Sequence, residues 1–356
     1  MATEEHPSPR ATRWRPRGRP AARSTTTDSV VAGTEATGRL RSVLPVTALA
    51  LVLWTALAVY TGTVQNAYEY TSQPEGKISN SSALAVIDLV IVALVALWAV
   101  LRPERARHAA PWLIVLAIVG IAWQVLTAKT GILHPPYWPA PQTLLRHLVD
   151  ERAILLRSVW ASAKLLALGF ALGGAAGFAL GVSMGWSQRV HYWANPLLKT
   201  FGPVPAVALI PAAFAILPSA HAASVLLIAL SAGFPIAVLT FSGVAGVARP
   251  YYDVAVTLGA SPRFLVWKVA IPAALPSVFV GLFMSLGAVF PTLVVSEQLG
   301  AKAGLGWYLQ WQQQWSAYPK MYVVLLVMVV LFSGLIALVF RIRDHVLSWQ
   351  RGLVRW

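Results

Sequence analysis

Long apolar segments separated by short polar loops dominate the pattern along this chain. Each is close to the roughly 20 residues that a helix needs to cross about 30 Å of hydrocarbon. We therefore predict an all-α polytopic membrane protein with eight spans. The segments lie near 43–63, 83–101, 111–128, 158–184, 201–217, 223–247, 274–295 and 321–340. The fifth segment is short and carries Pro203, Pro205 and Pro211, while Pro235 and Pro291 predict kinks in the sixth and seventh.

Residues 1–41 have a different character. They hold eight arginines among Pro, Ser, Thr and Gly, without any apolar period. High charge with few apolar residues is typical of disorder, so we expect a disordered basic tail on the cytoplasmic side. A nucleic-acid-binding arm is the alternative. A cleavable signal peptide is disfavoured because the apolar run that follows is of full spanning length.

The composition agrees with membrane insertion. Hydrophobic residues make up 57% of the 356 positions and charged residues only 12%, whereas a soluble domain carries about 25% charged residues. The chain has no cysteine. This excludes disulfide scaffolds, thiolate metal sites and cysteine nucleophiles.

The net charge of +15 predicts the orientation of the chain. Of the 28 Lys and Arg residues, an N-terminus in the cytoplasm places 20 in cytoplasmic segments and seven in external loops, with Lys164 inside a span. This distribution follows the positive-inside rule. We therefore predict a multi-pass protein of the plasma or inner membrane with both termini in the cytoplasm.

The longest external loop, 129–157, contains a proline-rich stretch and a short helix. Ile132-Leu133-His134-Pro135-Pro136 is expected to be extended. Pro141 then opens a helix in which Leu144, Leu145, Leu148 and Val149 share one face. An apolar face on an otherwise polar helix predicts that it lies along the membrane surface.

A ladder of glycines runs through the fourth segment. The members follow one another every four residues: Gly169, Gly173, Gly177, Gly181 and Gly185. Membrane helices use small residues where two backbones approach closely. We predict that this face packs on another helix, in the same chain or in a second copy, with a pore-lining role as the alternative.

The polar loop between the sixth and seventh segments predicts a helix, a turn and a second helix. Gly259 suits the left-handed position that ends the first helix. Ser261 suits the cap of the second, with Pro262 at its first turn. The second helix brings Phe264, Trp267 and Lys268 near one another. Exposed aromatic side chains in a long loop indicate a docking surface; a helix lying on lipid is the alternative.

This loop resembles the EAA loop of binding-protein-dependent ABC importer permeases. That pattern is Glu-Ala-Ala, three residues, Gly, nine residues, then Ile, any residue, Leu-Pro. The corresponding residues here are Asp253-Val254-Ala255, Gly259, Val269, Ile271 and Pro272, with Ala260, Ser261, Pro262 and Phe264 in the turn between them. Asp for the first Glu and Val for the first Ala are conservative departures.

Other elements resemble the nitrate/sulfonate/taurine branch of that family. Ile132-Leu133-His134-Pro135 with Pro141 is similar to its entry motif, and Lys164 stands where the branch commonly has arginine. Ser296-Glu297-Gln298-Leu299-Gly300 and Gly304-Leu305-Gly306-Trp307 are similar to two further elements. The resemblance covers roughly residues 111–350.

The resemblance implies a six-helix core of the type I importer, MetI-like class, preceded by two extra helices. The implied division is a tail at 1–41, extra helices at 42–110, a permease domain at 111–345 and a cytoplasmic end at 346–356. Implied partners are a second permease subunit, forming a homodimer, a cytosolic ATPase dimer and an external solute-binding protein. The implied substrate is a small anion of the nitrate, sulfonate or taurine class.

The chain itself lacks the Gly-x4-Gly-Lys-Ser/Thr phosphate loop. We therefore expect no cofactor in this chain, with ATP and Mg bound by the partner ATPase. We also predict no metal site and no catalytic residue, so this chain alone is not expected to be an enzyme.

Ionisable groups in or beside the spans are candidates for the transport pathway or gate. Lys164 contacts an anionic substrate, forms a structural pair or snorkels to the interface. Asp88 pairs with another helix or stays hydrated. Glu297, placed after the seventh span, shapes an outer gate or is a solvated loop carboxylate. Trp307, Trp311 and Trp315 follow a four-residue helical spacing, which indicates interfacial anchoring or docking of the solute-binding protein.

Two other functions remain open from the residues alone. An ion-coupled secondary transporter also has proline-broken helices and intramembrane charges, but it does not need the EAA-like loop. A membrane scaffold with a recruiting tail needs neither polar groups in a pore nor an ATPase.

Overall fold

The computed structural model describes residues 46–67, 81–202 and 204–350. Every regular element within these ranges is a helix. The described chain forms two compact units: one contains 46–57 and 88–119, and the other contains 58–67, 81–87 and 120–350. The predicted all-α class is confirmed.

The first unit is built from parts of three apolar helices. They are Val46–Thr63, α2 (Ser81–Leu101) and α3 (Pro103–Gln124). Trp54 Nε1 donates a hydrogen bond to the carbonyl oxygen of Leu113 over 3.0 Å, which joins the first helix to the third. Asp88 of α2 is buried at 6% exposure.

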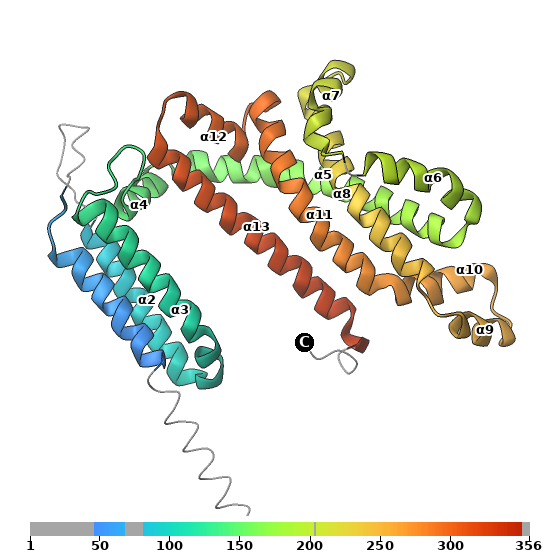
Figure 1. The fold of residues 1–356 in the computed structure, drawn as a ribbon, viewed down its shortest axis with the longest axis horizontal. Helices are drawn as coiled ribbons and strands as arrows, with labels where there is room; N and C mark the ends of the chain where they lie inside the picture. The colour runs from blue at the N-terminus through green and yellow to red at the C-terminus, as the bar shows by residue number, and fades with distance from the viewer. Residues whose placement is uncertain (1–45, 68–80, 203, 351–356) are drawn as a thin grey trace, which may run out of the picture. The chain divides into compact units, whose positions relative to one another are not determined.

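The second unit carries the remaining helices. After η1 (Val125–Lys129) they are α4 (Pro141–Asp150), α5 (Arg152–Trp186), α6 (Gln188–Phe201), η2 (Ala206–Leu209), α7 (Ile210–Ile216), α8 (Ala220–Ala245), α9 (Arg249–Thr257), α10 (Pro262–Phe264), η3 (Leu265–Ala270), α11 (Ile271–Gly300), α12 (Leu305–Gln314), α13 (Tyr318–Val346) and η4 (Ser348–Gln350). Figure 1 shows α5, α8, α11 and α13 as the long helices of this unit.

The glycine ladder sets the packing of α5 on α8. A Cβ added to Gly169 would lie 2.5 Å from Ile228 Cγ2, and one added to Gly185 would lie 2.5 Å from Val244 Cγ1. The three glycines between them meet the stretch 229–241 in the same order. The two helices are therefore parallel, and their backbones are in contact because no side chain separates them.

Helix α11 packs on α8 in the opposite direction. Gly243 of α8 lies against Ser277, and Ser231 shares a 2.8 Å hydrogen bond with Thr292. The aliphatic core between α5, α8 and α11 is closed by Phe332 of α13. The core therefore lies between the four long helices.

The predicted fifth span, 201–217, is not one continuous helix. The chain there forms a pair of helical segments, Gln188–Phe201 and Ala206–Ile216, bent by 88°. Proline restricts the residue before it and removes a backbone donor, and at Pro205 the backbone is extended, with ψ 129°, so the helix is broken there. The structure thus has seven helices of spanning length in the described ranges, or eight passes if the bent pair counts as one.

The packing of the bent pair favours eight passes. Parallel α5 and α8 require the chain between them to return the length of α8, about 39 Å for its 26 residues. Leu198 of α6 is buried beside Ala237, in the second half of α8. Ile210 of α7 is buried beside Ala223, near the start of α8. The pair therefore follows α8 backwards from one end to the other.

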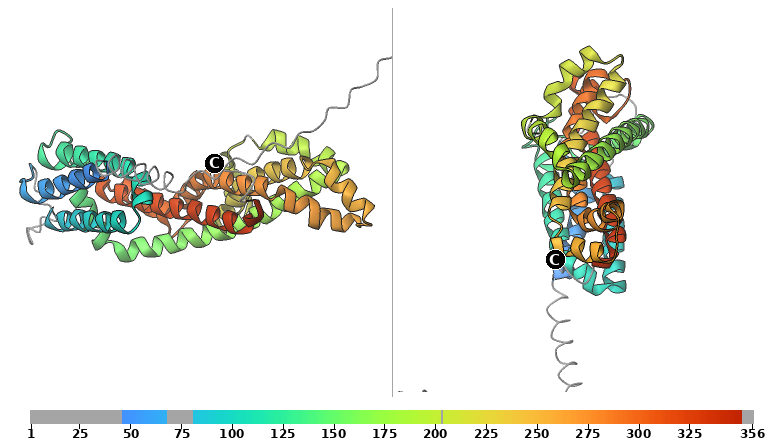
Figure 2. Two further views of the ribbon diagram at one scale, coloured as in Figure 1. Left: turned by 90° about the horizontal axis from the view of Figure 1, so that it is seen from below. Right: turned by 90° about the vertical axis from the view of Figure 1, so that its right-hand side faces the viewer.

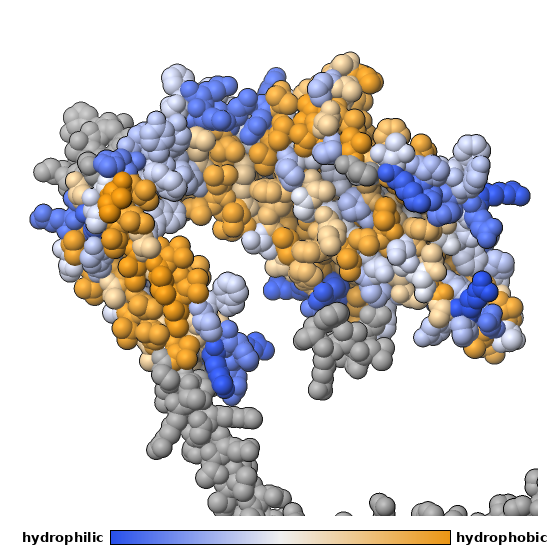
Figure 3. All heavy atoms as spheres, in the orientation of Figure 1, coloured by the Kyte–Doolittle hydropathy of each residue, from blue (hydrophilic) through white to orange (hydrophobic). Residues whose placement is uncertain are grey.

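The two ends of the second unit carry different elements. Helices α4 and α12 lie at one end, and α9 and α10 lie at the opposite end, as Figure 1 and the left view of Figure 2 show. Hydrophilic residues gather over α12 and, at the other end, around α6, α9 and α10, and apolar residues cover the surface between (Figure 3). An apolar band between two polar ends is the surface expected of a membrane-spanning unit.

Candidate functional site

The loop at 249–272 has the predicted helix–turn–helix structure. Helix α9 ends in a turn in which the N–H of Ala260 bonds to the carbonyl oxygen of Ala255 over 3.0 Å, and that of Gly259 bonds to Val256 over 2.9 Å. Gly259 has φ +83°. These are the two bonds and the left-handed residue of a Schellman motif.

The second helix begins as the sequence predicts. Ser261 Oγ accepts the backbone N–H of Phe264 over 3.3 Å, and Pro262 occupies the first turn. The helix continues through a π-helical turn, η3, into Ile271 and Pro272 of α11 without a break in the apolar span Pro262–Gly300. The second helix of the loop is therefore continuous with α11. We call residues 249–272 the coupling loop, after the role that the resemblance implies.

The coupling loop presents a largely apolar surface to solvent. Helix α9 has no buried residue. The most exposed large apolar side chains are Tyr251, Val254, Leu258 and Trp267, with Leu258 at 83%. Asp253 and Phe264 are exposed as well. Exposed apolar patches of this kind mark interaction sites.

One aromatic residue anchors the loop to the helical core. Tyr252 packs on the cluster of Val244, Ala270 and Ala274, and its ring lies 6.2 Å from that of Trp186 at the end of α5. Burial raises the pKa of Tyr252 above its ordinary value. Through Tyr252 the loop therefore contacts α5, α8 and α11.

Glu297 is not in a loop, contrary to the sequence-based placement. Helix α11 continues to Gly300, and Glu297 is 1% exposed. Its Oε1 accepts the hydroxyl of Ser162 of α5 over 2.6 Å, and its Oε2 accepts the N–H of Gly306 over 2.7 Å. Ser162 Oγ in turn accepts the N–H of Leu305 over 2.8 Å. Hydropathy falls at this point because the helix carries a buried polar contact there, and not because it ends.

The Gly-Leu-Gly element is explained by this carboxylate. Gly304 has φ +144°, and a Cβ on it would lie 2.5 Å from Glu297 Cδ. A Cβ on Gly306 would lie 3.0 Å from Glu297 Cβ. Both glycines thus let the first turn of α12 approach the carboxylate, which also suits the positive end of the α12 dipole.

Lys164 lies on the exposed side of α5, away from the glycine ladder. Its Nζ sits 4.9 Å from the ring centroid of Trp160, one turn earlier, in a cation–π contact. The structure therefore does not bring Lys164 and Glu297 together. Their predicted roles in a pathway or gate stay predictions.

A second polar cluster joins α4, α5, α12 and α13. Glu151, just before α5, accepts hydrogen bonds from Tyr308 of α12 and pairs with Lys320 of α13. Burial alone would raise the pKa of Glu151, but the bonds from Lys320 and Tyr308 outweigh it and hold that pKa below its usual range. Burial and the same carboxylate raise the pKa of Tyr308.

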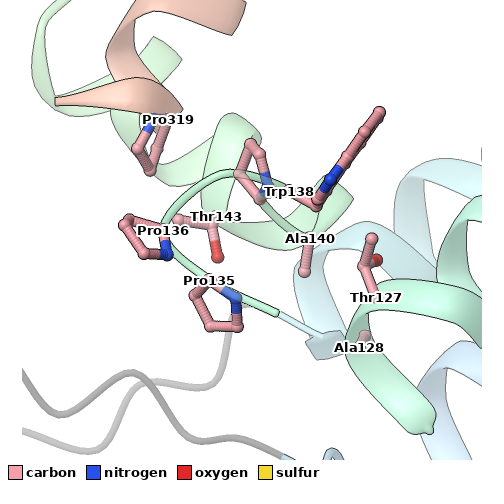
Figure 4. Close-up of a pocket in the computed structure, with 9 residues that line it drawn as sticks. Thr127, Ala128, Pro135, Pro136, Trp138, Ala140, Thr143 and Pro319 are labelled. Carbon is pink, nitrogen blue, oxygen red and sulfur yellow. The ribbon is translucent and has the colours of Figure 1, made fainter. Parts of the chain in front are cut away.

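The proline-rich loop that precedes α4 folds against this end and lines a pocket (Figure 4). Its lining residues are Thr127, Ala128, Pro135, Pro136, Trp138, Pro139, Ala140, Thr143 and Pro319. Trp123 Nε1 holds the loop by donating to the carbonyl oxygen of Pro139 over 3.0 Å. None of the nine lining residues is ionisable, so the pocket offers no charge to an anion. The predicted helix at Pro141 is confirmed.

Helix α12 carries the predicted tryptophans. The rings of Trp307 and Trp311 lie 5.6 Å apart, and Trp315 follows as the residue that ends the helix. Trp311 and Trp315 are exposed. Among the described residues, no group of three or more His, Asp or Glu side chains could hold a metal ion.

The family comparison decides what these features belong to. Residues 169–352 match the family model described as the binding-protein-dependent transport system inner membrane component. The chain belongs to this family. The matched range contains the glycine ladder, the coupling loop and Glu297.

Relatives of this permease include named transport proteins. It is 29% identical over 265 residues to the aliphatic sulfonates transport permease protein SsuC of Bacillus subtilis, covering 72% of this chain and 91% of that protein. It is 30% identical to an ABC transporter permease protein of Methanocaldococcus jannaschii, covering 66% and 90%. It is 29% identical to the taurine transport system permease protein TauC of Escherichia coli, covering 54% and 72%.

Among solved structures, the permease is similar to a chain of the inward-facing MetNI methionine ABC transporter. That match has a TM-score of 0.48 and 20% identity, and it covers 55% of this chain and 98% of the other. Family membership makes this chain an ABC importer permease, a multi-pass transport component, as the sequence predicts.

The sequence did not identify several residues that organise the site. Ser162, Glu151, Tyr308 and Lys129 all make side-chain contacts with residues at least 65 positions away. Lys129 Nζ donates to the carbonyl oxygens of Val64 and, over 3.1 Å, of Thr61. The only local signal in the sequence was a polar residue at the end of an apolar segment. Such a signal does not show which distant residue the side chain contacts.

Proposed function

We propose that this permease imports a small anion of the sulfonate class, including taurine-like amino sulfonates, in partnership with a cytosolic ATPase and an external solute-binding protein. The family supports the importer role, and the names of SsuC and TauC support the substrate class. The observation that carries the mechanism is the exposed apolar coupling loop, which is continuous with a core helix.

The ATPase docks on the coupling loop. Its footprint is the surface of Asp253, Ala255 and Phe264 with the turn at Gly259–Pro262, and Leu258 and Trp267 supply the apolar area. Burial of such side chains drives association. ATP and Mg are bound by the ATPase, and its closure pulls on α11 through Pro272.

The coupling loop and both termini face the cytoplasm in this proposal. The positive charges favour this orientation because Arg249, Arg263 and Lys268 flank the loop itself. Helices α4 and α12 then face the external solute-binding protein.

A homodimer supplies the second wall of the pathway. The predicted division into a tail at 1–41, extra helices at 42–110, a permease domain at 111–345 and an end at 346–356 is part of this proposal. The family match begins at residue 169 and ends at 352, which supports a transport role for the later part of the chain.

The docking proposal is tested with one exposed residue. Leu258→Asp places a charge in the centre of the docking surface, where no buried neighbour depends on it. We expect the variant to reach the membrane in normal amounts but to lose co-purification with the ATPase. The control is Lys302→Gln, in the external loop. A charge at Leu326, on the exposed face of α13, would face lipid, so that position is not used as a control. Retained co-purification in Leu258→Asp would contradict the docking site.

The ion-coupled alternative is tested in the same preparation. Uptake of a sulfonate into liposomes should require ATP, the ATPase and the solute-binding protein together. Uptake driven by an ion gradient with this chain alone would refute the importer proposal. Binding of the solute-binding protein to nitrate but not to sulfonates would correct the substrate class only.

A further inference from the structure

The cytoplasmic-loop end and the α12 end of the second unit are joined by a single helical element. The span Pro262–Gly300 runs for 39 residues, and residues 301–304 separate its end from Leu305, where α12 begins. At about 1.5 Å per residue this is roughly 58 Å. Glu297 lies at the far end of the helix that carries the docking surface at its near end.

At that far end, Glu297 joins three helices through one carboxylate. It belongs to α11, it accepts a hydrogen bond from Ser162 of α5, and it accepts another from Gly306 of α12. Ser162 closes the ring by accepting the N–H of Leu305. We call this four-residue set, Ser162, Glu297, Leu305 and Gly306, the carboxylate clamp.

The carboxylate clamp is sealed from water. Glu297 is 1% exposed, Ser162 is 0% exposed and Leu305 is 2% exposed. A buried carboxylate that loses a donor is left with an unpaired charge, which is costly in a water-free site. Opening the clamp therefore requires a large free energy, unlike the breaking of a solvent-exposed contact, in which water replaces the lost partner.

The opposite side of α12 is fastened as well. Tyr308 is 1% exposed and donates to Glu151, which pairs with Lys320 of α13. Trp311 and the end of the helix, Gln313, Gln314 and Trp315, remain exposed. A lid that opens independently needs few buried contacts, and α12 has the opposite character.

We propose that Glu297 is a positioning residue that fastens α12 to α5 and α11, so that the external helix moves with the coupling lever as one rigid body. This inference rests on the proposed importer function. In it, closure of the ATPase tilts α11, and the carboxylate clamp carries the tilt to the surface that α12 presents outside. Rigid-body switching of packed elements is an established form of such transitions.

The first test follows α12 in the otherwise unchanged permease. The chain has no cysteine, so two introduced cysteines can be spin-labelled without background. Gln314→Cys on α12 and Leu156→Cys on α5 are both at exposed positions. In the complex with the ATPase and the solute-binding protein, we expect the same distance distribution between the two labels with and without a non-hydrolysable ATP analogue. A nucleotide-dependent change in this distance would overturn the proposal.

The second test loosens the carboxylate clamp. Glu297→Gln keeps the shape but turns an amide N–H toward a donor, so one of the two bonds is lost. We expect uptake to fall about tenfold, and the stimulation of ATP hydrolysis by the solute-binding protein to fall with it, because the clamp links the two sides in both directions. Lys302→Gln, an exposed charge removal five residues further on, is the matched control. Normal uptake in Glu297→Gln would also overturn the proposal.

A double variant separates positioning from mere folding. If Ser162→Ala and Glu297→Gln act through one clamp, the double variant is no worse than the worse single variant. Multiplying effects would mean separate roles and contradict the clamp. If the unaltered complex shows no ATP-dependent uptake, the proposed function has failed, and the label distances then decide the rigid-body inference separately.

Discussion

Glycine serves two different physical needs in this permease. Gly259 is required for its backbone angle, since φ is +83° and a Cβ there would meet no atom within 4 Å. Gly177 is required for space, since a Cβ there would lie 3.0 Å from Gly233 Cα in the facing helix. The two kinds of glycine therefore predict different consequences of the same substitution to alanine.

At Gly259, the Gly259→Ala substitution is expected to strain only the turn. A left-handed angle costs a non-glycine residue about 1–2 kcal/mol, and nothing in the core depends on the position. We expect normal amounts in the membrane, unchanged thermal stability of the helical core and a severalfold loss of uptake. Gly287→Ala in α11, where a Cβ also meets no atom within 4 Å, is the control. Equal uptake in both variants would show that the turn geometry is dispensable.

At Gly177, the Gly177→Ala substitution is expected to push α5 away from α8. Overpacking of this kind costs about 1–3 kcal/mol, so the detergent-solubilised protein should unfold at a lower temperature. Gly174→Ala, on the same helix, is the matched control because its Cβ would lie 3.7 Å from Ile236 Cδ1, an ordinary contact. The comparison is made by intrinsic fluorescence during heating, and similar melting of the two variants would contradict the close-packing role.

Single elements show how far the sequence could predict the site. The coupling loop was predictable in detail because its helix end, turn and cap are formed by residues within about ten positions of one another. The environment of Glu297 was not, because its partner Ser162 is 135 positions away. When spans are predicted from hydropathy, a span is taken to end at the first polar residues. Hydropathy does not distinguish a polar residue in water from one that bonds to another helix.

The junction of α4 and α5 gives a prediction of pH dependence. Glu151 has a pKa below its ordinary value of 4.5 in the folded protein, so the folded state binds its proton less readily than the unfolded chain. Its contribution to stability is therefore present above pH 4.5 and is lost as pH falls below it, through the lower folded pKa. With the side chain 21% exposed, we expect Glu151→Gln to cost about 1–2 kcal/mol at pH 7.

The measurement compares melting temperatures of the original protein and Glu151→Gln from pH 7 to pH 3. The difference between the two proteins should shrink as pH falls below 4.5, because protonated Glu151 resembles the amide. Asp150→Asn, at an adjacent and more exposed carboxylate, should show a smaller difference at pH 7. A difference that grows on acidification would refute the role assigned to Glu151.

The whole molecule follows the predicted alternation of apolar spans and polar loops, except at the fifth segment. Seven segments were predictable because each is long and continuous in apolar residues. The bounds of the fifth segment, 201–217, were wrong because the chain returns along α8 through two helices, the amphipathic α6 and the short α7. Only η2 and α7 lie within an apolar run, so the pattern did not include α6. Packing along α8, and not hydropathy, is what favours counting the bent pair as one pass.

The number of passes can be tested by labelling single cysteines, because the chain has none of its own. If the bent pair crosses the membrane, Gln188→Cys at the start of α6 faces the same side as Leu258→Cys in the coupling loop, and His221→Cys at the start of α8 faces the other. All three positions are exposed. We expect a membrane-impermeant maleimide to label His221→Cys from outside intact cells, and Gln188→Cys and Leu258→Cys only in inverted vesicles. Labelling of Gln188→Cys together with His221→Cys from outside would make α6 and α7 a re-entrant loop and would place an odd number of passes between residues 46 and 346. It would also contradict the parallel packing of α5 and α8, because one of the two helices would then cross in the opposite direction.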